Sequence, residues 1–148
     1  MRFWEDILDG DYIDCGRHTV SEQEIGEFAQ RYDPQPFHCD PAVAKLSVYG
    51  GVIASGFHTL SLANRMAFES FLRDVASMGS TAVDEVRWLQ PVRPGDELSL
   101  RLQVVQKQHS RNKPDRGVVR FRYDVTNQRR EPVCTMTITE IVKRREQA

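Results

Sequence analysis

Apolar side chains in the first half of the chain recur at the spacing of a helix. From Ile25 to Tyr32 they fall at positions i, i+3, i+4 and i+7, which places them on one helix face. Ser21 precedes this stripe as a candidate N-cap, and Glu24 follows it by three residues, the spacing of a capping box. The proline after Asp33 disfavours the α conformation there. The pattern therefore predicts a helix that begins after Ser21 and ends near Tyr32.

Two further helices are indicated downstream. Residues 33–39 contain two prolines and predict an irregular loop. Asp40 and Pro41 suit an N-cap and a first helical position, so a short helix should follow and stop by the glycines at 50 and 51. A longer helix should begin after Ser55 and end before Gly79. Its residues are apolar nearly all round, which is typical of a helix enclosed by a sheet.

The second half of the chain changes to the alternation of strands. Leu98, Leu100 and Leu102, for example, are separated by polar residues. The predicted strands cover residues 81–89, 97–106, 118–127 and 133–143. Short polar segments separate them, so the strands should pair with antiparallel neighbours. Because helices come first and strands last, the chain is predicted to be a single α+β domain spanning residues 1–148.

Composition and charge narrow the classes of function. The chain has 148 residues, the length of one ordinary domain. Its 20 Lys and Arg residues balance 21 Asp and Glu residues, so no overall charge favours nucleic acid or an anionic membrane. No apolar run approaches the roughly 18 residues of a membrane span. Three scattered cysteines and the lack of an apolar leader predict a cytoplasmic protein. The Cys and His spacings match no metal motif, so no metal site is expected.

An acid and an imidazole lie five residues apart in the predicted loop. Prolines at positions 34 and 36 restrict the bends between Asp33 and His38, so both side chains can face one small site. Such a pair can orient a water molecule, take its proton and return a proton to carbon. Two structural roles remain open on these residues alone: Asp33 could bond to its own turn, and His38 could be a packed core residue.

Three segments of the chain carry motifs whose order along the sequence is informative. The first is Asp33-x-Gln35-Pro36-x-His38, the second is Gly-Val-Ile-Ala-Ser-Gly at residues 51–56, and the third is Trp-Leu-Gln-Pro-Val-Arg-Pro-Gly-Asp at residues 88–96. In this order they resemble the MaoC-like, (R)-specific enoyl-CoA hydratases. That family usually has Asp-x-Asn-Pro-x-His in the first segment, so Gln35 is a departure. The second segment is similar to the family's entry to its central helix, and the third to a turn before one of its strands.

The resemblance implies a fold, an assembly and a reaction. The fold would be the hotdog fold, in which a long central helix is wrapped by a curved antiparallel sheet. The assembly would be a homodimer or a higher homo-oligomer, with acyl-CoA bound near the subunit interface. The reaction would be the reversible syn addition of water to a trans-2-enoyl thioester, giving an (R)-3-hydroxyacyl thioester. No cofactor is implied besides the CoA thioester substrate.

The resemblance also implies roles for individual residues. Asp33 and His38 would be catalytic, and the Gly56 N–H would bind the thioester carbonyl at the positive end of the central helix. Gln35, Phe57 and Asn64 would contact the substrate. Asn64 takes the position at which many family members place a small hydroxyl that supports the histidine.

Three basic residues between the second and third predicted strands, Arg111, Lys113 and Arg116, are candidates for binding the phosphates of CoA. A solvated hairpin loop is the alternative for them. His58 could line the substrate entrance or be a partly buried structural residue. Cys39 is adjacent to His38, and neighbouring residues rarely face one another, which disfavours a Cys–His nucleophile.

Two other functions stay open at this point. A hotdog thioesterase would act on the same substrates, but it needs a carboxylate that activates water toward the carbonyl carbon, and the spacing of Asp33 and His38 favours hydration. The other function is a non-catalytic module that binds acyl thioesters. Gln35 and Asn64 keep that alternative open, because both depart from the family pattern.

Overall fold

The computed structural model describes residues 1–146. Within that range the strands are β1 (Tyr12–Thr19), β2 (Ser77–Trp88), β3 (Glu97–His109), β4 (Arg116–Thr126) and β5 (Pro132–Lys143). The helices are α1 (Glu22–Tyr32), α2 (Pro36–Cys39), α3 (Pro41–Leu46) and α4 (Gly56–Ser70), with 3-10 turns η1 (Trp4–Asp6) and η2 (Leu72–Asp74). The four predicted strands are all present, and the α+β class is confirmed.

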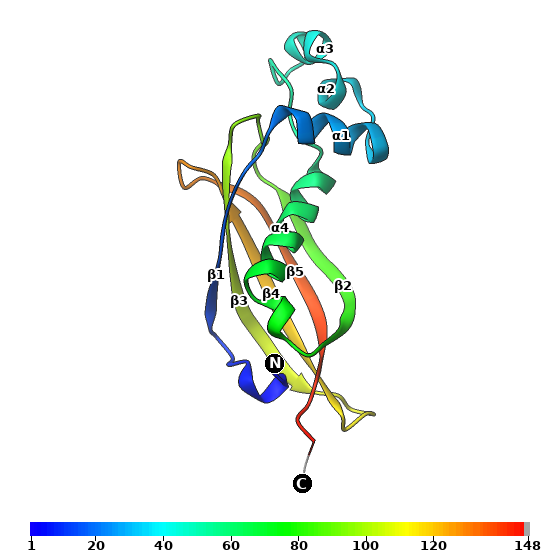
Figure 1. Cartoon of the computed structure of the whole chain (residues 1–148), viewed down its shortest axis with the longest axis vertical. Coiled ribbons are helices and arrows are strands. Elements are labelled where there is room, and N and C mark those ends of the chain that lie inside the picture. Colours follow the sequence, from blue (N-terminus) through cyan, green and yellow to red (C-terminus); the bar gives the residue numbers. More distant parts are fainter. Residues whose placement is uncertain (147–148) are drawn as a thin grey trace.

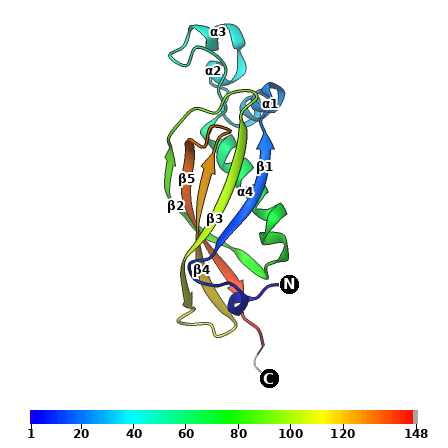
Figure 2. The same ribbon diagram turned by 90° about the vertical axis from the view of Figure 1, so that its left-hand side faces the viewer.

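The strands form one antiparallel sheet in the order β1-β3-β4-β5-β2. The sheet curves around α4, which lies along its inner face (Figure 1). Helices α1, α2 and α3 gather at one end of the molecule, beyond the sheet, whereas η1 and the end of β5 lie at the other (Figures 1 and 2). A central helix wrapped by a curved sheet is the arrangement that the sequence motifs imply.

The core lies between α4 and the inner face of the sheet. The inward-facing residues of β3 and β4 alternate with outward-facing ones and have almost no exposed surface. On α4 the small side chains of Ala63 and Ala67 are buried, so the helix can approach the sheet closely. Phe57 and Phe68 on the same helix are 61% and 52% exposed. The prediction of a helix buried nearly all round is therefore wrong, because the sheet covers one face of it.

Other differences concern element boundaries and one strand that the sequence does not predict. Helix α4 ends at Ser70, and Gly79 lies within β2, where the register with β5 shifts and its φ is 107°. The segment after the helix pairs with β5 instead of continuing the helix. Strand β1 escapes prediction because Cys15 is its one buried residue. Gly16 also interrupts its pairing with β3, with a φ of 73°.

Helix α1 begins as predicted, because Ser21 Oγ accepts a hydrogen bond from the Glu24 N–H at 3.1 Å. The carboxylate of Glu24 turns toward two histidines. Its Oε1 lies 2.9 Å from His18 Nε2 on β1 and 3.5 Å from His58 Nε2 on α4. Glu24 therefore links three elements of the fold.

Candidate active site

Asp33 and His38 are brought together by the junction between two helices. Asp33 is the C-cap of α1. His38 lies on the single turn of α2, not in an irregular loop, so the loop prediction for residues 33–39 is wrong at this end. The reason is Pro36, whose fixed φ suits the first residue of a helical turn. Gln35 occupies the N-cap position without a capping bond from its side chain. The turn holds His38 on a regular backbone, and its side chain is buried.

The imidazole of His38 is held on both sides. Its Nδ1 lies 2.6 Å from the Ile53 carbonyl oxygen. A carbonyl oxygen can only accept, so Nδ1 carries the proton in the neutral ring. Its Nε2 lies 3.3 Å from Asp33 Oδ2. A neutral His38 therefore presents an Nε2 lone pair beside a carboxylate oxygen, and these two acceptors can receive both protons of one water molecule.

The carboxylate of Asp33 accepts two further hydrogen bonds. Ser55 Oγ donates to Oδ2 at 2.7 Å, and Gln35 Nε2 donates to Oδ1 at 2.8 Å. Burial alone raises the pKa of Asp33. The hydrogen bonds from Gln35 and Ser55 and the nearby His38 outweigh burial and hold the pKa below its ordinary value of 3.8. Asp33 is therefore a carboxylate at neutral pH.

Ser55 has two roles at the start of the central helix. Its hydroxyl oxygen accepts from the Phe57 N–H at 3.3 Å, as an N-cap does, while its proton goes to Asp33. The hydroxyl that supports the dyad thus comes from the helix cap. Asn64, expected to take a supporting position, lies two turns further along on the exposed face of α4 and does not line the cavity. Sequence reasoning identified Ser55 as a cap but missed its bond to Asp33.

A cavity of about 490 Å³ opens in front of the dyad. Asp33, Gln35, His38, Gly56 and Phe57 all line it, so the structure brings these five expected site residues together. The remaining lining residues are Phe37, Tyr49, Ile53, Ala54, Thr59, Trp88, Leu89, Gln90, Pro91 and Val92. Gly56 is the first residue of α4, and within residues 1–146 its N–H has no hydrogen-bond partner. That N–H sits at the positive end of the helix, where it can bind an oxygen that gains negative charge.

Another part of the cavity wall is formed by residues 88–92, which lead into the turn that follows β2. Buried Asp96 accepts from the Arg93 N–H at 2.9 Å and from Gln128 Nε2 at 2.9 Å. Gly95 closes the turn with a φ of 88°, a value that suits glycine. The Ala54 N–H donates to the Val92 carbonyl at 2.8 Å and joins this wall to the segment before α4. The third sequence motif therefore shapes the cavity and does not supply reacting groups.

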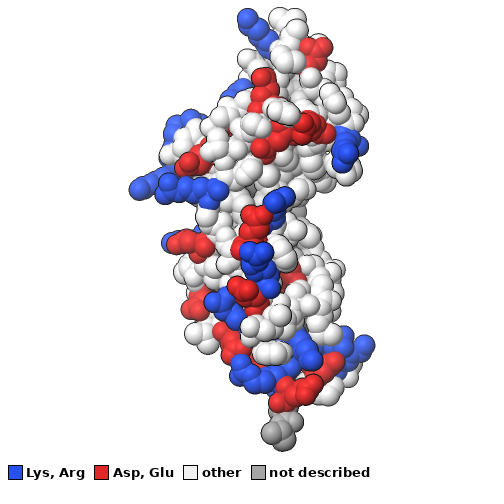
Figure 3. All heavy atoms as spheres, viewed as in Figure 1, with Lys and Arg blue, Asp and Glu red and all other residues white. Residues whose placement is uncertain are grey.

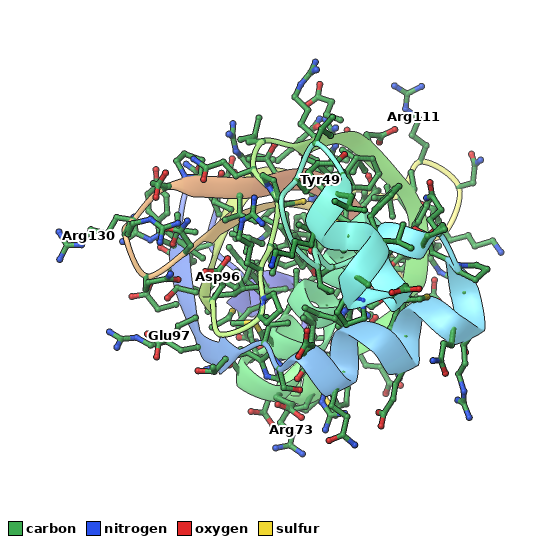
Figure 4. The ribbon with its side chains drawn as sticks, turned by 90° about the horizontal axis from the view of Figure 1, so that it is seen from above. Tyr49, Arg73, Asp96, Glu97, Arg111 and Arg130 are labelled. Carbon is green, nitrogen blue, oxygen red and sulfur yellow. The ribbon has the colours of Figure 1, made fainter. Side chains whose placement is uncertain are left out.

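The three basic residues proposed to bind CoA lie elsewhere. Arg111, Lys113 and Arg116 belong to the β3–β4 hairpin, at the opposite end of the molecule from α1, α2 and α3 (Figure 1). Arg116 forms an ion pair with Asp115 at 2.8 Å, and Arg111 projects outward from the fold (Figure 4). Within one chain the structure does not bring them to the cavity. Spacing in the sequence cannot show which end of a long hairpin a loop occupies.

His58 also turns away from the cavity, although it stands two residues after Gly56. Its ring stacks on Phe28 with a centroid separation of 4.8 Å and contacts Glu24. Burial lowers the pKa of His58, although the charge of Glu24 opposes that shift. These contacts favour the structural alternative for this residue. The thiols of Cys15 and Cys134 are buried as well, which raises their pKa to about 11.

Over residues 1–146, no helix combines the length and apolar character that crossing a bilayer requires. In the same part of the chain, no three His, Cys, Asp or Glu side chains gather as metal ligands would.

The fold and the dyad together define a hotdog protein with an acid–base pair at the end of its central helix. Residues 10–127 match the family model described as MaoC like domain. The chain therefore belongs to the MaoC-like family. It is also 30% identical over 125 residues to the uncharacterized protein YdeM of Bacillus subtilis, a match that covers 84% of this chain and 87% of YdeM.

Solved structures agree with this assignment. The MaoC-like dehydratase from Rhodospirillum rubrum is 38% identical, with a TM-score of 0.87 over 99% of this chain and 100% of that chain. Rv0216 from Mycobacterium tuberculosis, which has a double hotdog fold, gives a TM-score of 0.84 at 14% identity. That match covers 99% of this chain and 46% of Rv0216, and it shows the fold alone. Family membership supports a hydratase or dehydratase in general terms.

Proposed function

We propose that this chain catalyses the reversible hydration of trans-2-enoyl-CoA thioesters to (R)-3-hydroxyacyl-CoA thioesters. One observation carries the proposal: two proton acceptors, Asp33 Oδ2 and His38 Nε2, lie 3.3 Å apart in a cavity that the Gly56 N–H also borders. The stereochemistry and the CoA carrier come from the resemblance to (R)-specific hydratases.

Gly56 prepares the substrate for attack. The thioester carbonyl oxygen accepts a hydrogen bond from the Gly56 N–H, which has no competing partner within residues 1–146. As water adds to the β-carbon, negative charge moves onto this oxygen as an enolate. The N–H and the positive end of α4 stabilise that charge more than they stabilise the neutral carbonyl. This differential binding lowers the barrier to addition.

Asp33 and His38 take one proton from water and return it to the substrate. The water molecule donates one hydrogen bond to the Asp33 carboxylate and the other to His38 Nε2, and it keeps the hydrogen that faces Asp33. Its oxygen attacks the β-carbon as His38 takes a proton. The proton then passes through Asp33 Oδ2, 3.3 Å away, to the α-carbon, which restores both side chains. Delivery from the same side as the water gives syn addition, and water and the thioester supply all the atoms.

A panel of trans-2-enoyl-CoA thioesters tests the proposal, with loss of the enoyl absorbance and release of free thiol followed in the same wells. We expect absorbance loss without thiol release, and turnover at least about 100-fold lower for Asp33→Asn. Asp14→Asn, which removes an exposed carboxylate on β1, is the matched control and should keep the wild-type rate. Thiol release by the wild type would identify a thioesterase. Binding without any turnover would identify a non-catalytic module.

We also propose that the chain works as a homodimer through the side that carries β2. This strand is at the edge of the sheet, so its outer backbone groups are unpaired by the sheet. Met78 and Val83 on β2 are large apolar side chains with more than 40% of their surface exposed. The flank where β2 runs shows few charged side chains in the view of Figure 3, although Asp84, Glu85 and Arg87 on β2 are exposed. An unpaired edge strand that also carries exposed apolar side chains is suited to an interface.

Sedimentation equilibrium tests this assembly. We expect twice the chain mass at micromolar concentration, and weaker association for Val83→Lys, which places a charge on the exposed edge. Val105→Lys, on the outward-facing side of β3, is the matched control because Val105 is exposed to a similar extent. A wild-type monomer at all concentrations would contradict the dimer.

A further inference from the structure

The indole of Trp88 is packed against the backbone of Gly56. An ideal Cβ built on Gly56 would lie 2.5 Å from both Nε1 and Cε2 of Trp88. Real Cβ atoms do not approach other atoms so closely, so the position needs glycine as long as the indole stays there. The ring is held edge-to-face by Phe57, with centroids 5.8 Å apart. The last residue of β2 and the first turn of α4 thus form one small aromatic cluster.

This cluster borders the reacting end of the cavity. Trp88 lines the same cavity as Asp33 and His38. A carbonyl oxygen that accepts from the Gly56 N–H lies about 2.9 Å from the nitrogen. The carbonyl carbon and the two atoms bonded to it, the sulfur and the α-carbon, would then lie within several ångströms of the indole edge. In the proposed reaction the acyl chain continues from the β-carbon past the dyad, away from this contact.

Trp88 is also poorly explained as a core residue. Its side chain is 48% exposed and Phe57 is 61% exposed, so neither is needed to complete the core. Within residues 1–146 the indole N–H has no hydrogen-bond partner. A large, half-exposed ring that lines a cavity and presents an unused donor is suited to contact a ligand.

We infer that Trp88 is a specificity-determining residue, whose indole forms the wall over the thioester carbonyl and excludes substituents on the α-carbon. The inference rests on the proposed hydration, because that reaction places the thioester at Gly56. A 2-methyl group on the substrate would meet the indole edge, whereas lengthening the chain beyond the β-carbon would not. The enzyme therefore accepts unbranched enoyl thioesters in preference to their 2-methyl counterparts.

The first test compares kcat/KM for trans-2-butenoyl-CoA and its 2-methyl derivative. One methyl group in an apolar pocket changes kcat/KM by about 10- to 200-fold. We expect wild-type protein to prefer the unbranched substrate, Trp88→Ala to reduce that preference about tenfold or more, and Trp88→Phe to lie between them. Trp4→Phe, which changes the only other tryptophan, should keep the wild-type ratio. An unchanged ratio in Trp88→Ala would overturn the inference.

The second test does not depend on turnover. In the Trp4→Phe protein, Trp88 is the only tryptophan, so fluorescence reports on the cavity wall. Saturated butanoyl-CoA, which cannot be hydrated, should change this fluorescence in a saturable manner, and should leave the Trp88→Phe protein unchanged. Melting curves of both variants establish that they fold. Free CoA serves as the control for absorption by adenine.

The two tests separate the failure of each proposal. Turnover with an unchanged substrate ratio and no fluorescence response would overturn the role of Trp88 and leave the hydratase intact. A saturable response in a protein that hydrates no enoyl thioester would support the wall at Gly56 and overturn the hydration. Neither turnover nor response would overturn both.

Discussion

Two tryptophans, at opposite ends of the molecule, lie against a glycine in the same way. Trp88 covers Gly56 beside the dyad, and Trp4 covers Gly117 at the start of β4, where an added Cβ would also collide with the ring. Their other contacts differ. The Trp4 N–H donates to the Val118 carbonyl at 3.2 Å, and Lys107 Nζ lies 4.0 Å from the centre of its ring. Trp88 has neither a partner for its N–H within the described residues nor a cation on its face.

The surroundings of the two tryptophans differ in the same way as the two ends of the molecule. At the lower end of Figure 1, the groups around Trp4 satisfy one another: Glu5 pairs with Arg144 at 3.1 Å, and Arg145 with Asp6 at 2.6 Å. These contacts join the two ends of the chain. At the upper end the dyad, the Gly56 N–H and Trp88 face a cavity. The same close packing of a tryptophan on a glycine therefore closes the fold at one end and borders a cavity at the other.

The largest difference between the ends should appear in catalysis. We expect His38→Ala to lower turnover of enoyl-CoA by at least about 100-fold, because it removes a proton acceptor. His109→Ala removes the ring that packs against Trp4 at a centroid distance of 4.5 Å. It should leave turnover close to that of the wild type. A comparable loss in both variants would show that His38 acts through stability, and not through chemistry.

The two glycines should respond to alanine in opposite ways. Trp4 is fixed by its contacts, so Gly117→Ala should lower the free energy of unfolding by about 1–3 kcal/mol in urea titrations. Trp88 is half exposed and can turn toward solvent, so Gly56→Ala should cost less stability but reduce kcat/KM. Trp88→Ala should relieve the steric part of the Gly56→Ala defect in a double-mutant cycle. Additive effects in that cycle would contradict the contact.

Ser55→Ala should affect both stability and pH dependence. Loss of the helix cap should lower the free energy of unfolding by about 1 kcal/mol. Loss of the hydrogen bond to Asp33 raises the pKa of that carboxyl toward its ordinary value. We expect the acid limb of the pH–rate profile to move to higher pH in this variant.

Ser55→Thr keeps a hydroxyl and should restore most of the wild-type profile. The folded pKa of Asp33 is depressed, so its contribution to stability is complete above its ordinary value of 3.8 and is lost as pH falls through the folded pKa. Ser55→Ala should therefore show a smaller loss of stability in that acidic range. An acid limb that does not move would place the controlling pKa elsewhere.

The smallest effect concerns His58, which lies outside the cavity. Burial lowers its pKa below 6.5, so the unfolded chain binds a proton that the folded chain resists. Stability should therefore fall as pH is lowered from about 7 through 6.5 toward the folded pKa. His58→Phe keeps a ring against Phe28 and should flatten this part of the Tm-against-pH curve. If the slope of the Tm-against-pH curve stays the same in His58→Phe, other titrating groups cause the pH dependence.

Much of the fold was predictable because its signals are local. The helix after Ser21, the cap at Ser55 and the alternation of β3 and β4 depend on neighbours a few residues apart. Strand β1 has no such signal, because most of its side chains are exposed and Gly16 interrupts it. The exposed face of α4 was not predicted either, since apolar composition alone does not show that a sheet covers one side.

The candidate site divides in the same way. Asp33, Gln35 and His38 lie within six residues, so a short motif identifies them. Ser55 reaches Asp33 from 22 positions away, and Trp88 at the end of β2 reaches Gly56 at the start of α4. Such contacts depend on how elements pack. The position of the basic β3–β4 hairpin around Arg111, at the opposite end of the molecule from α1, also depends on how the elements pack and could not be predicted from spacing.

The double use of Ser55 has an evolutionary consequence. A lineage that gave up hydration would lose the need for Asp33 and His38, yet its central helix would still require a capping side chain. Serine would then persist at this position through selection on folding alone, beside a degenerate dyad. Among relatives, a serine at this position would be weak evidence of catalytic activity. The joint presence of Asp33 and His38 would be the better indicator that the activity has been retained.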